Sequence, residues 1–380
     1  MKAKPHIGLI AILMMFPQIV ETIYSPALPH IAQAFEVSSQ LASQTLSVYF
    51  IAFALGVVFW GRAADTFGRR PAMIAGLLTY GIGSIIALLA NSFELLLLAR
   101  VISAFGAATG SVVTQTILRD SFDSTELAKM FSLMAMGLSL SPIIGLMAGG
   151  TLARFLGHTG IFTLLLILAL VLLAMTIRSL AETKPDKQPN IKLTALALRM
   201  CRDSKIWQSA AMVALFNLML FSYYSLGPFL FTKLGFTSLE FGYSGLVLAV
   251  GAFIGSYINT ALLSKGLQPQ QLTKLAAMIA LLSAIGICLI GEQLLFLLPM
   301  LGIVISFGVA IPNTLSQALT DYKEVAGSAG ALLGLCYYLL LGAGLVLAGH
   351  VQHLGLVLLA SALLACLLSL KSVSRSLPAT

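Results

Sequence analysis

The sequence predicts an all-α integral membrane protein with twelve transmembrane helices in two six-helix bundles. Hydrophobic residues make up 58% of its 380 residues and charged residues only 9%, whereas a soluble domain carries about 25% charged residues. Twelve stretches are apolar over the length of about 20 residues that a bilayer requires. The longest polar segment follows the sixth stretch and divides the chain into six plus six. Most of the protein surface therefore has to face lipid.

The predicted spans are separated by short polar turns, the last two by only four residues. The first run is too long for the apolar region of a secretory signal, so we interpret it as an uncleaved first helix. The twelve spans are residues 7–28, 44–62, 72–90, 95–118, 130–152, 159–180, 207–231, 240–263, 272–291, 294–315, 326–349 and 354–370.

Basic residues predict the orientation of these spans. With both termini in the cytoplasm, nineteen of the 22 Lys and Arg residues lie in cytoplasmic segments. Only Arg154 and Lys233 fall outside, and Arg100 lies within a span. This asymmetry follows the positive-inside rule. The net charge of +8 therefore indicates membrane topology and not a nucleic-acid partner.

The polar segment 181–206 is predicted to be a cytoplasmic linker, because it has too few hydrophobic residues for a domain of its own. It separates an N-terminal bundle, residues 1–180, from a C-terminal bundle, residues 207–380. A chain of six plus six spans with such a linker is typical of transporters whose halves rock about a central site.

Glycines about four residues apart recur within single spans. Small residues at this spacing let membrane helices approach closely. The contacts they predict are either static packing or surfaces that slide during transport. The sets are Gly145 and Gly149 in the fifth span, Gly251 and Gly255 in the eighth, and Gly327, Gly330 and Gly334 in the eleventh.

Glu21 and Arg100 are the two ionisable residues well inside predicted spans. A charge there costs several kcal/mol unless it is paired or hydrated, so a functional role is the default interpretation. The residues lie on antiparallel helices, roughly 12 Å and 8 to 10 Å from the outer surface at 1.5 Å per residue. Their depths allow a direct or water-mediated pair. The alternative to a proton or substrate site is a fixed structural ion pair.

Uncharged polar and aromatic residues within spans are candidates for a substrate cavity. Pro17, one turn below Glu21, is predicted to kink the first helix, which membrane helices tolerate where they line a cavity. For each candidate, packing is an equal alternative to substrate contact. The candidates are Gln18, Tyr24, Asn217, Tyr223, Tyr224, Asn313, Gln317, Tyr337 and Tyr338.

The loop between the second and third spans reads GRAADTFGRRP, residues 61–71. This resembles the signature loop of major facilitator transporters, in which an aspartate lies four residues after a glycine. A second glycine follows three residues later, and then two basic residues. The match in spacing, position and sidedness implies the major facilitator fold.

Other segments are similar to the Bcr/CflA drug exporters. ETIYSPALP, residues 21–29, is similar to their Tyr-x-Pro-Ala segment, and LRDSF, residues 118–122, to their Val-Arg-Asp-Leu-Tyr. An aspartate often lies two residues before the tyrosine of that branch. This chain has Thr22 there, and its acid, Glu21, is one position earlier. The resemblance implies proton-coupled efflux.

The resemblance also implies a cytoplasmic gate, in which Asp65 contacts the other half near the eleventh span when the cavity faces outward. The gate residues are Gly61, Asp65, Gly68, Arg69, Arg70, Arg119 and Asp120.

The leading hypothesis is a bacterial inner-membrane exporter that exchanges protons for a small, drug-like organic molecule by alternating access. Glu21 would bind either the proton or the substrate, and Arg100 would tune that acid or hold an anionic group. We expect a multi-pass monomer with cytoplasmic termini, whose partners are protons, the substrate and the lipid bilayer. The proton gradient is expected to replace a cofactor, since no Gly-x-x-x-x-Gly-Lys-Ser/Thr loop for ATP occurs.

The main alternative is export of one dedicated metabolite, such as a metallophore or other polycarboxylate siderophore, with Arg100 as the anion anchor. A channel or a membrane enzyme is a remote alternative. We find no catalytic set, and the four cysteines lack metal-ligand spacing. His350 and His353, which could share a metal at the outer surface, are interpreted as ordinary loop residues.

Overall fold

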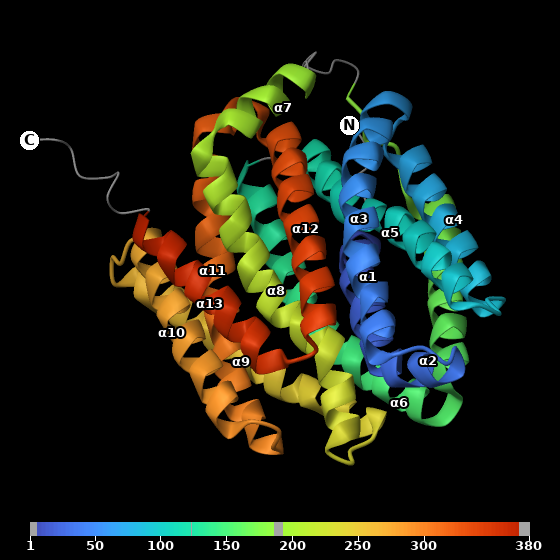
Figure 1. The fold of residues 1–380 in the computed structure, drawn as a ribbon. Helices are drawn as coiled ribbons and strands as arrows, with labels where there is room; N and C mark the ends of the chain where they lie inside the picture. Colours follow the sequence, from blue (N-terminus) through green and yellow to red (C-terminus); the bar gives the residue numbers. More distant parts are fainter. Residues whose placement is uncertain (1–5, 123, 186–192, 372–380) are drawn as a thin grey trace, which may run out of the picture.

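Long α-helices make up nearly all of the structure, a computed structural model that describes residues 6–122, 124–185 and 193–371. No β-strand occurs among these residues. The helices of the first half of the sequence, blue to green, lie mainly on one side of the molecule, and those of the second half, yellow to red, on the other (Figure 1).

The first half of the chain crosses the molecule six times. Its first pass is continued by a short 3-10 turn and a second helix, because Pro26 and Pro29 lack the N–H groups that would extend α1 unbroken. The elements are α1 (Ile7–Tyr24), η1 (Ser25–Ala27), α2 (Leu28–Ala34), α3 (Ser39–Phe67), α4 (Arg69–Leu88), α5 (Phe93–Ser121) and α6 (Ser124–Ser179).

The helix α6 contains two passes. Its 56 residues would measure roughly 84 Å in a straight helix, far more than the roughly 30 Å hydrocarbon core of a bilayer. Gly157 breaks the helix with φ 62° and ψ −160°, a conformation that favours glycine. The two parts correspond to the predicted fifth and sixth spans.

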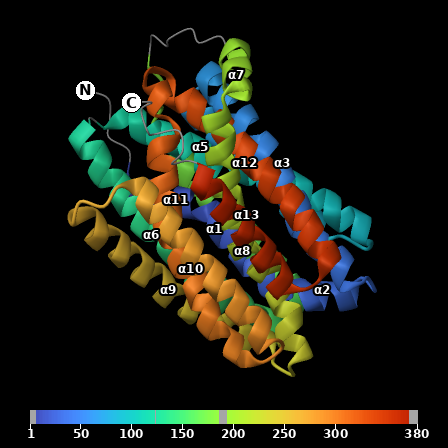
Figure 2. The same ribbon diagram turned by 60° about the vertical axis from the view of Figure 1, so that its left-hand side comes forward.

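The second half begins with a short helix, α7, at the end of the molecule that we call the linker end (Figures 1 and 2). Six further passes follow it. The elements are α7 (Leu193–Arg202), α8 (Ser204–Lys233), α9 (Ser238–Ser264), α10 (Pro269–Ile290), η2 (Leu294–Phe296), α11 (Leu297–Ala318), η3 (Thr320–Val325), α12 (Ala326–Val351) and α13 (Leu354–Lys371).

Ten helical segments of the described chain are long and apolar enough to cross a membrane. This count takes α6 once and leaves out the shorter apolar segment Leu354–Leu370. With α6 counted as two passes and α13 added, the helices agree with the twelve predicted spans. The predicted domain limits, within residues 181–206, stay a prediction because residues 186–192 lie outside the described part.

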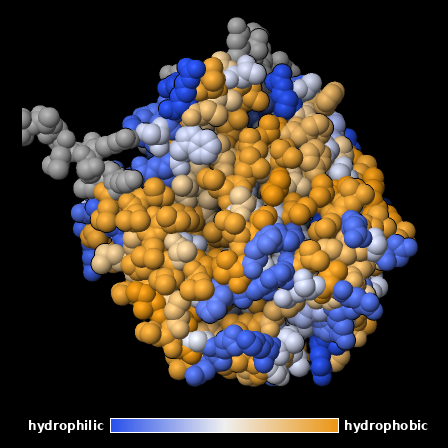
Figure 3. Space-filling view, viewed as in Figure 1, coloured by the Kyte–Doolittle hydropathy of each residue, from blue (hydrophilic) through white to orange (hydrophobic). Residues whose placement is uncertain are grey.

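The outer surface of the bundle is apolar. Phe253 and Leu289 are 74% and 83% exposed, although both are large hydrophobic side chains. Hydrophobic residues cover most of the face in Figure 3, and hydrophilic ones lie near its top and in parts of its lower half. Such a surface is stable in lipid and not in water.

Two of the predicted glycine sets lie at tight helix contacts. A Cβ atom at Gly149 would lie well under 3.0 Å from the backbone oxygen of Ile23 in α1, and one at Gly255 would lie 2.6 Å from that of Ile305 in α11. The eleventh-span set differs. A Cβ at Gly327 or Gly330 would meet its nearest neighbour only at 3.4 or 3.7 Å.

We predict that Gly149→Ala lowers the free energy of unfolding by about 1 to 3 kcal/mol, because the added methyl meets rigid backbone. Gly81→Ala is the matched control. A Cβ there has no neighbour within 4 Å, so its effect should stay within about 0.5 kcal/mol. Thermal unfolding of both variants in detergent measures the difference, and equal melting temperatures would contradict the packing role.

Candidate functional site

A cavity of about 810 Å³ lies between the two halves at the linker end. It runs inward between α3 and α5 of the first half and α11 and α12 of the second. Both charged and aromatic side chains line it. Its lining includes Gly61, Asp65 and Arg119 of the first half and Gly327, Tyr337 and Tyr338 of the second.

At the opposite end the halves are held together. His30 of α2 is hydrogen-bonded to the hydroxyl of Ser238 of α9, with 3.1 Å between Nε2 and Oγ. The Gln44 amide donates to the Val346 carbonyl at 3.2 Å, which ties the start of α3 to the end of α12. The molecule is therefore open at the linker end and closed at the other.

Glu21 lies between the halves near the inner end of the cavity. Its side chain is only 4% exposed. It acts electrostatically on Tyr224, Tyr337 and Tyr338 of the second half and on Tyr49 of the first. Within the described residues its carboxyl group has neither a hydrogen-bond donor nor an ion-pair partner.

The neighbouring Thr22 faces in another direction. Its hydroxyl donates to the Gln18 carbonyl in its own helix at 2.8 Å, and its side chain packs against Gly145 of α6. One residue turns a helix by about 100°. In this chain the acid at position 21 therefore faces the second half, whereas position 22 is packed inside the first.

Arg100 of α5 is held by aromatic rings. Its guanidinium carbon lies 3.9 Å from the centre of the Tyr24 ring and 4.4 Å from that of Tyr49. The residue is 1% exposed, and its Nε and Nη2 groups have no hydrogen-bond partner. Arg100 and Glu21 act on each other electrostatically, but no direct ion pair joins them in the described structure. Cation–π contacts with the two rings stabilise the buried cation instead.

Aromatic rings join the halves around Glu21. The Phe50 ring lies edge-on to Phe221 with 4.5 Å between centroids, and Phe53 lies edge-on to Tyr338 at 4.9 Å. Both contacts link α3 to the second half.

The predicted cavity residues lie in several environments. Tyr337 and Tyr338 line the cavity. Tyr223 donates to Ser244, and Asn313 donates to Asn259, within the second half. Asn217 and Gln317 donate to carbonyl groups of their own helices, and Tyr24 and Tyr224 are buried. Gln18 is partly buried, and its backbone carbonyl accepts the Thr22 hydroxyl.

The predicted gate loop takes part in a charge cluster around the buried Arg69. Arg69, only 3% exposed, donates to Asp120 at 2.6 Å and to Asp65 at 3.1 Å. Arg119 lies beside the start of α12, since a Cβ at Gly327 would be 3.4 Å from its Nη1. The gate residues of α3, α4 and α5 thus meet at the linker end, next to the first turn of α12.

Glu182, which the sequence analysis did not select, is the acceptor that completes this cluster. Partial burial would raise the pKa of its carboxyl group. The backbone N–H groups of Lys184, Arg69, Arg70 and Thr183 outweigh this and lower that pKa below its usual value. Two of these groups, at 2.9 and 3.2 Å, belong to the first turn of α4, so Glu182 acts as its cap. The signal in the sequence is an acid directly after the sixth span.

A family comparison agrees with this geometry. The model of the Major Facilitator Superfamily matches residues 10–346, which is most of the chain. The chain belongs to the Major Facilitator Superfamily. This family consists of transporters and is not an enzyme class.

Relatives support the narrower resemblance to the Bcr/CflA branch, which is confirmed. An uncharacterized transporter of Rickettsia bellii is 30% identical over 90% of this chain and 88% of its own length. The bicyclomycin resistance protein homolog of Haemophilus influenzae is 25% identical over 86% of this chain and 84% of its own. Multidrug resistance protein MdtL of Klebsiella pneumoniae is 24% identical over 86% and 83%.

A solved structure shows the same fold. The crystal structure of a D-xylose–proton symporter superposes with a TM-score of 0.77 at 14% identity, covering 96% of this chain and 98% of that one. At this identity the likeness concerns the fold alone.

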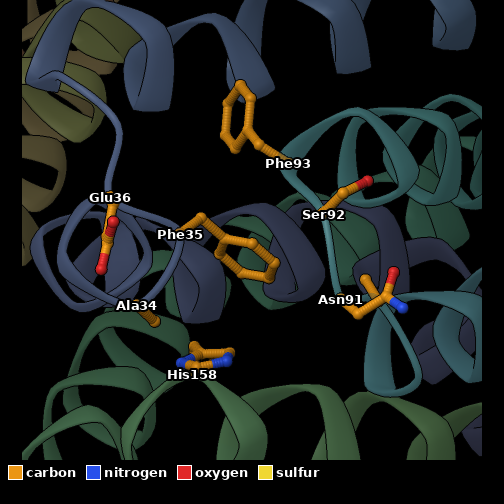
Figure 4. A pocket seen from close by; sticks show the side chains of 8 residues that line it. Ala34, Phe35, Glu36, Asn91, Ser92, Phe93 and His158 are labelled. Atoms are coloured by element: carbon orange, nitrogen blue, oxygen red, sulfur yellow. The ribbon is translucent and has the colours of Figure 1, made fainter.

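A smaller hollow, of about 360 Å³, lies at the opposite end of the molecule (Figure 4). Phe35, after α2, projects into it toward the ring of His158, with 5.6 Å between centroids. Residues of the turn before α5, such as Asn91, form another wall. It lies at the turns that join helices of the first half.

We predict that Glu182→Ala lowers the free energy of unfolding at pH 7 by about 1 kcal/mol, the usual cost of a lost helix cap. Because the pKa of Glu182 is lowered in the folded state, its stabilisation is present above the unfolded value of 4.5. It is lost as pH falls through the folded value. Melting curves from pH 7 to pH 3 should converge for wild type and variant. Glu182→Gln, which keeps an acceptor oxygen, should lie between them at pH 7.

Proposed function

We propose that the protein is a proton-coupled exporter that carries small, drug-like organic molecules out of the bacterial cytoplasm. The observation that carries this proposal is Glu21, a buried acid without a partner between the halves, at the inner end of the cavity. An unpaired carboxylate in such surroundings is costly. It is neutralised either by a proton or by a cationic group of the substrate, and this competition makes the exchange obligatory.

The direction of transport rests on the orientation of the cavity. Most basic residues of the chain lie at the linker end or in its loops, which the positive-inside rule assigns to the cytoplasm. The cavity then faces the cytoplasm and takes up substrate there. The closed opposite end faces the outside of the inner membrane, where protons are more abundant. The protein acts in this cycle as a monomer, and the proton gradient is its source of energy.

The lining of the cavity favours a cationic or neutral aromatic substrate. Tyr337 and Tyr338 offer ring surfaces beside the Glu21 carboxyl group, and organic cations bind to the faces of such rings. Relatives named for bicyclomycin and multidrug resistance support a drug-like substrate.

A second candidate is export of a polycarboxylate metabolite such as a siderophore. The observation that favours it is Arg100, whose Nε and Nη2 groups lack partners. A carboxylate that reached Arg100 would satisfy both groups with a pair of parallel hydrogen bonds.

The coupling role of Glu21 is tested by Glu21→Gln. This variant mimics the protonated acid and should abolish export driven by a pH gradient, while its melting temperature stays close to that of wild type. The measurement is substrate uptake into inverted vesicles with an imposed gradient. Asp65→Asn is the control at the gate, where transport should slow but still respond to the gradient. Gradient-driven export by Glu21→Gln at the wild-type rate would refute the proposal.

The substrate class is tested by Arg100→Lys, assayed with cationic, neutral and anionic compounds in the same vesicles. If the substrate is cationic, transport of cations should change by less than about threefold, since lysine keeps the charge between Tyr24 and Tyr49. If the substrate is a polycarboxylate, its transport should fall by tenfold or more, because the bidentate donor is lost. Equal loss for all three classes would indicate a structural role of Arg100.

A further inference from the structure

A buried hydrogen bond joins the two halves near Glu21. The hydroxyl of Ser25, in the η1 turn, donates to the backbone carbonyl of Tyr224 in α8. Ser25 is 0% exposed and Tyr224 is 1% exposed, so no water competes for this bond. It lies deeper in the protein than the half-buried contact between His30 and Ser238.

Proline makes the Tyr224 carbonyl available. In a helix this carbonyl accepts the N–H group of the residue four positions later. That residue is Pro228, which has no N–H group. A buried carbonyl without a partner is costly, and Ser25 of the other half takes the place of the missing donor.

The bond is also connected to Glu21. The backbone N–H of Ser25 donates to the backbone carbonyl of Glu21, one turn earlier. The Tyr224 side chain, on the other side of the bond, interacts electrostatically with the Glu21 carboxyl group. Movement of this turn when Glu21 gains or loses a proton therefore also moves Ser25.

We propose that Ser25 is a positioning residue for the transport cycle, whose hydroxyl closes the opposite end by satisfying the carbonyl that Pro228 leaves free in α8. The bond holds while the cavity faces the linker end and has to break before the opposite end opens. Once that end opens, water reaches the Tyr224 carbonyl and replaces Ser25. This inference rests on the proposed alternating access and identifies one hydrogen bond that controls it.

The test is the ratio of the two conformations. Spin labels at positions 40 and 293, both exposed at the opposite end on different halves, report its opening in a variant free of the four native cysteines. We expect Ser25→Ala to raise the open fraction relative to the closed one about three- to tenfold, the effect of one buried hydrogen bond. Ser25→Thr, which keeps a hydroxyl group, should restore at least half of the wild-type ratio.

Ser225→Ala is the matched control. Ser225 is likewise 0% exposed and lies one residue from Tyr224, but its hydroxyl has no hydrogen-bond partner. Its loss should leave the ratio within about twofold. An equal shift in Ser25→Ala and Ser225→Ala would overturn the proposal, since it would show a general effect of emptying the site.

Pro228→Ala supplies a second test, because alanine restores an N–H group for the Tyr224 carbonyl. In the Pro228→Ala variant, the additional change Ser25→Ala should alter the ratio of open to closed conformations by less than about twofold. If the two substitutions acted independently, their effects on this ratio would multiply. A full Ser25→Ala effect in the presence of alanine at position 228 would overturn the role of proline.

Transport measurements separate this inference from the proposed function. Ser25→Ala should change the maximal rate of transport more than the substrate concentration at half-maximal rate, and should leave the dependence on a pH gradient intact. If transport by Glu21→Gln still responded fully to the pH gradient, the proposed proton coupling would be refuted. The label distances would still test whether Ser25 closes the opposite end. Unchanged label distances in Ser25→Ala would refute the role of the Ser25 hydrogen bond, even if the protein is a proton-coupled exporter.

Discussion

The fold depends on one constraint, which is that polar groups inside the membrane have to find their partners within the protein. Arg69, at the linker end, is satisfied by two aspartates. Arg100, deep in the first half, has instead the faces of two tyrosine rings. Glu21 alone among these charges has no partner in the described residues. The group without a hydrogen bond or ion pair is thus the one to which we assign the proton and the substrate.

The same constraint explains why proline is useful within these helices. Each internal proline removes one hydrogen bond and leaves one carbonyl to be satisfied elsewhere. At Pro17 the affected carbonyl, that of Leu13, lies against Gly110 of α5, where a Cβ would approach it to 2.7 Å. At Pro228 the affected carbonyl is bonded by the other half of the molecule. The hydrogen bond missing at Pro228 thus frees a carbonyl for a specific contact, which a fully hydrogen-bonded helix backbone could not make.

The sequence was sufficient for the spans, and insufficient for the partners of the buried charges. The spans follow from hydropathy. The motif of fixed spacing places Asp65 and Arg69 in one loop, but the pairing of Arg69 with Asp120 of α5 was not predicted. Glu182 was missed because its role depends on the path of the chain after α6, which no local pattern encodes. The prediction allowed a direct pair between Arg100 and Glu21, which act on each other electrostatically but form no ion pair in the described structure. It did not anticipate the tyrosines, because rotation about each helix axis decides which side chains meet.

If one proton drives each cycle, as we propose, the neutral hydrogen bonds of the closed end match the energy that it supplies. The hydrogen bonds that join the halves there, such as those of Ser25 and Gln44, involve neutral groups, each worth about 0.5 to 1.5 kcal/mol. A single pH unit of gradient corresponds to about 1.4 kcal/mol. One or two such bonds could therefore be broken and remade in each cycle of the proposed proton exchange. A buried ion pair at the same place would cost about 3 to 5 kcal/mol to break and would hold the protein in one state.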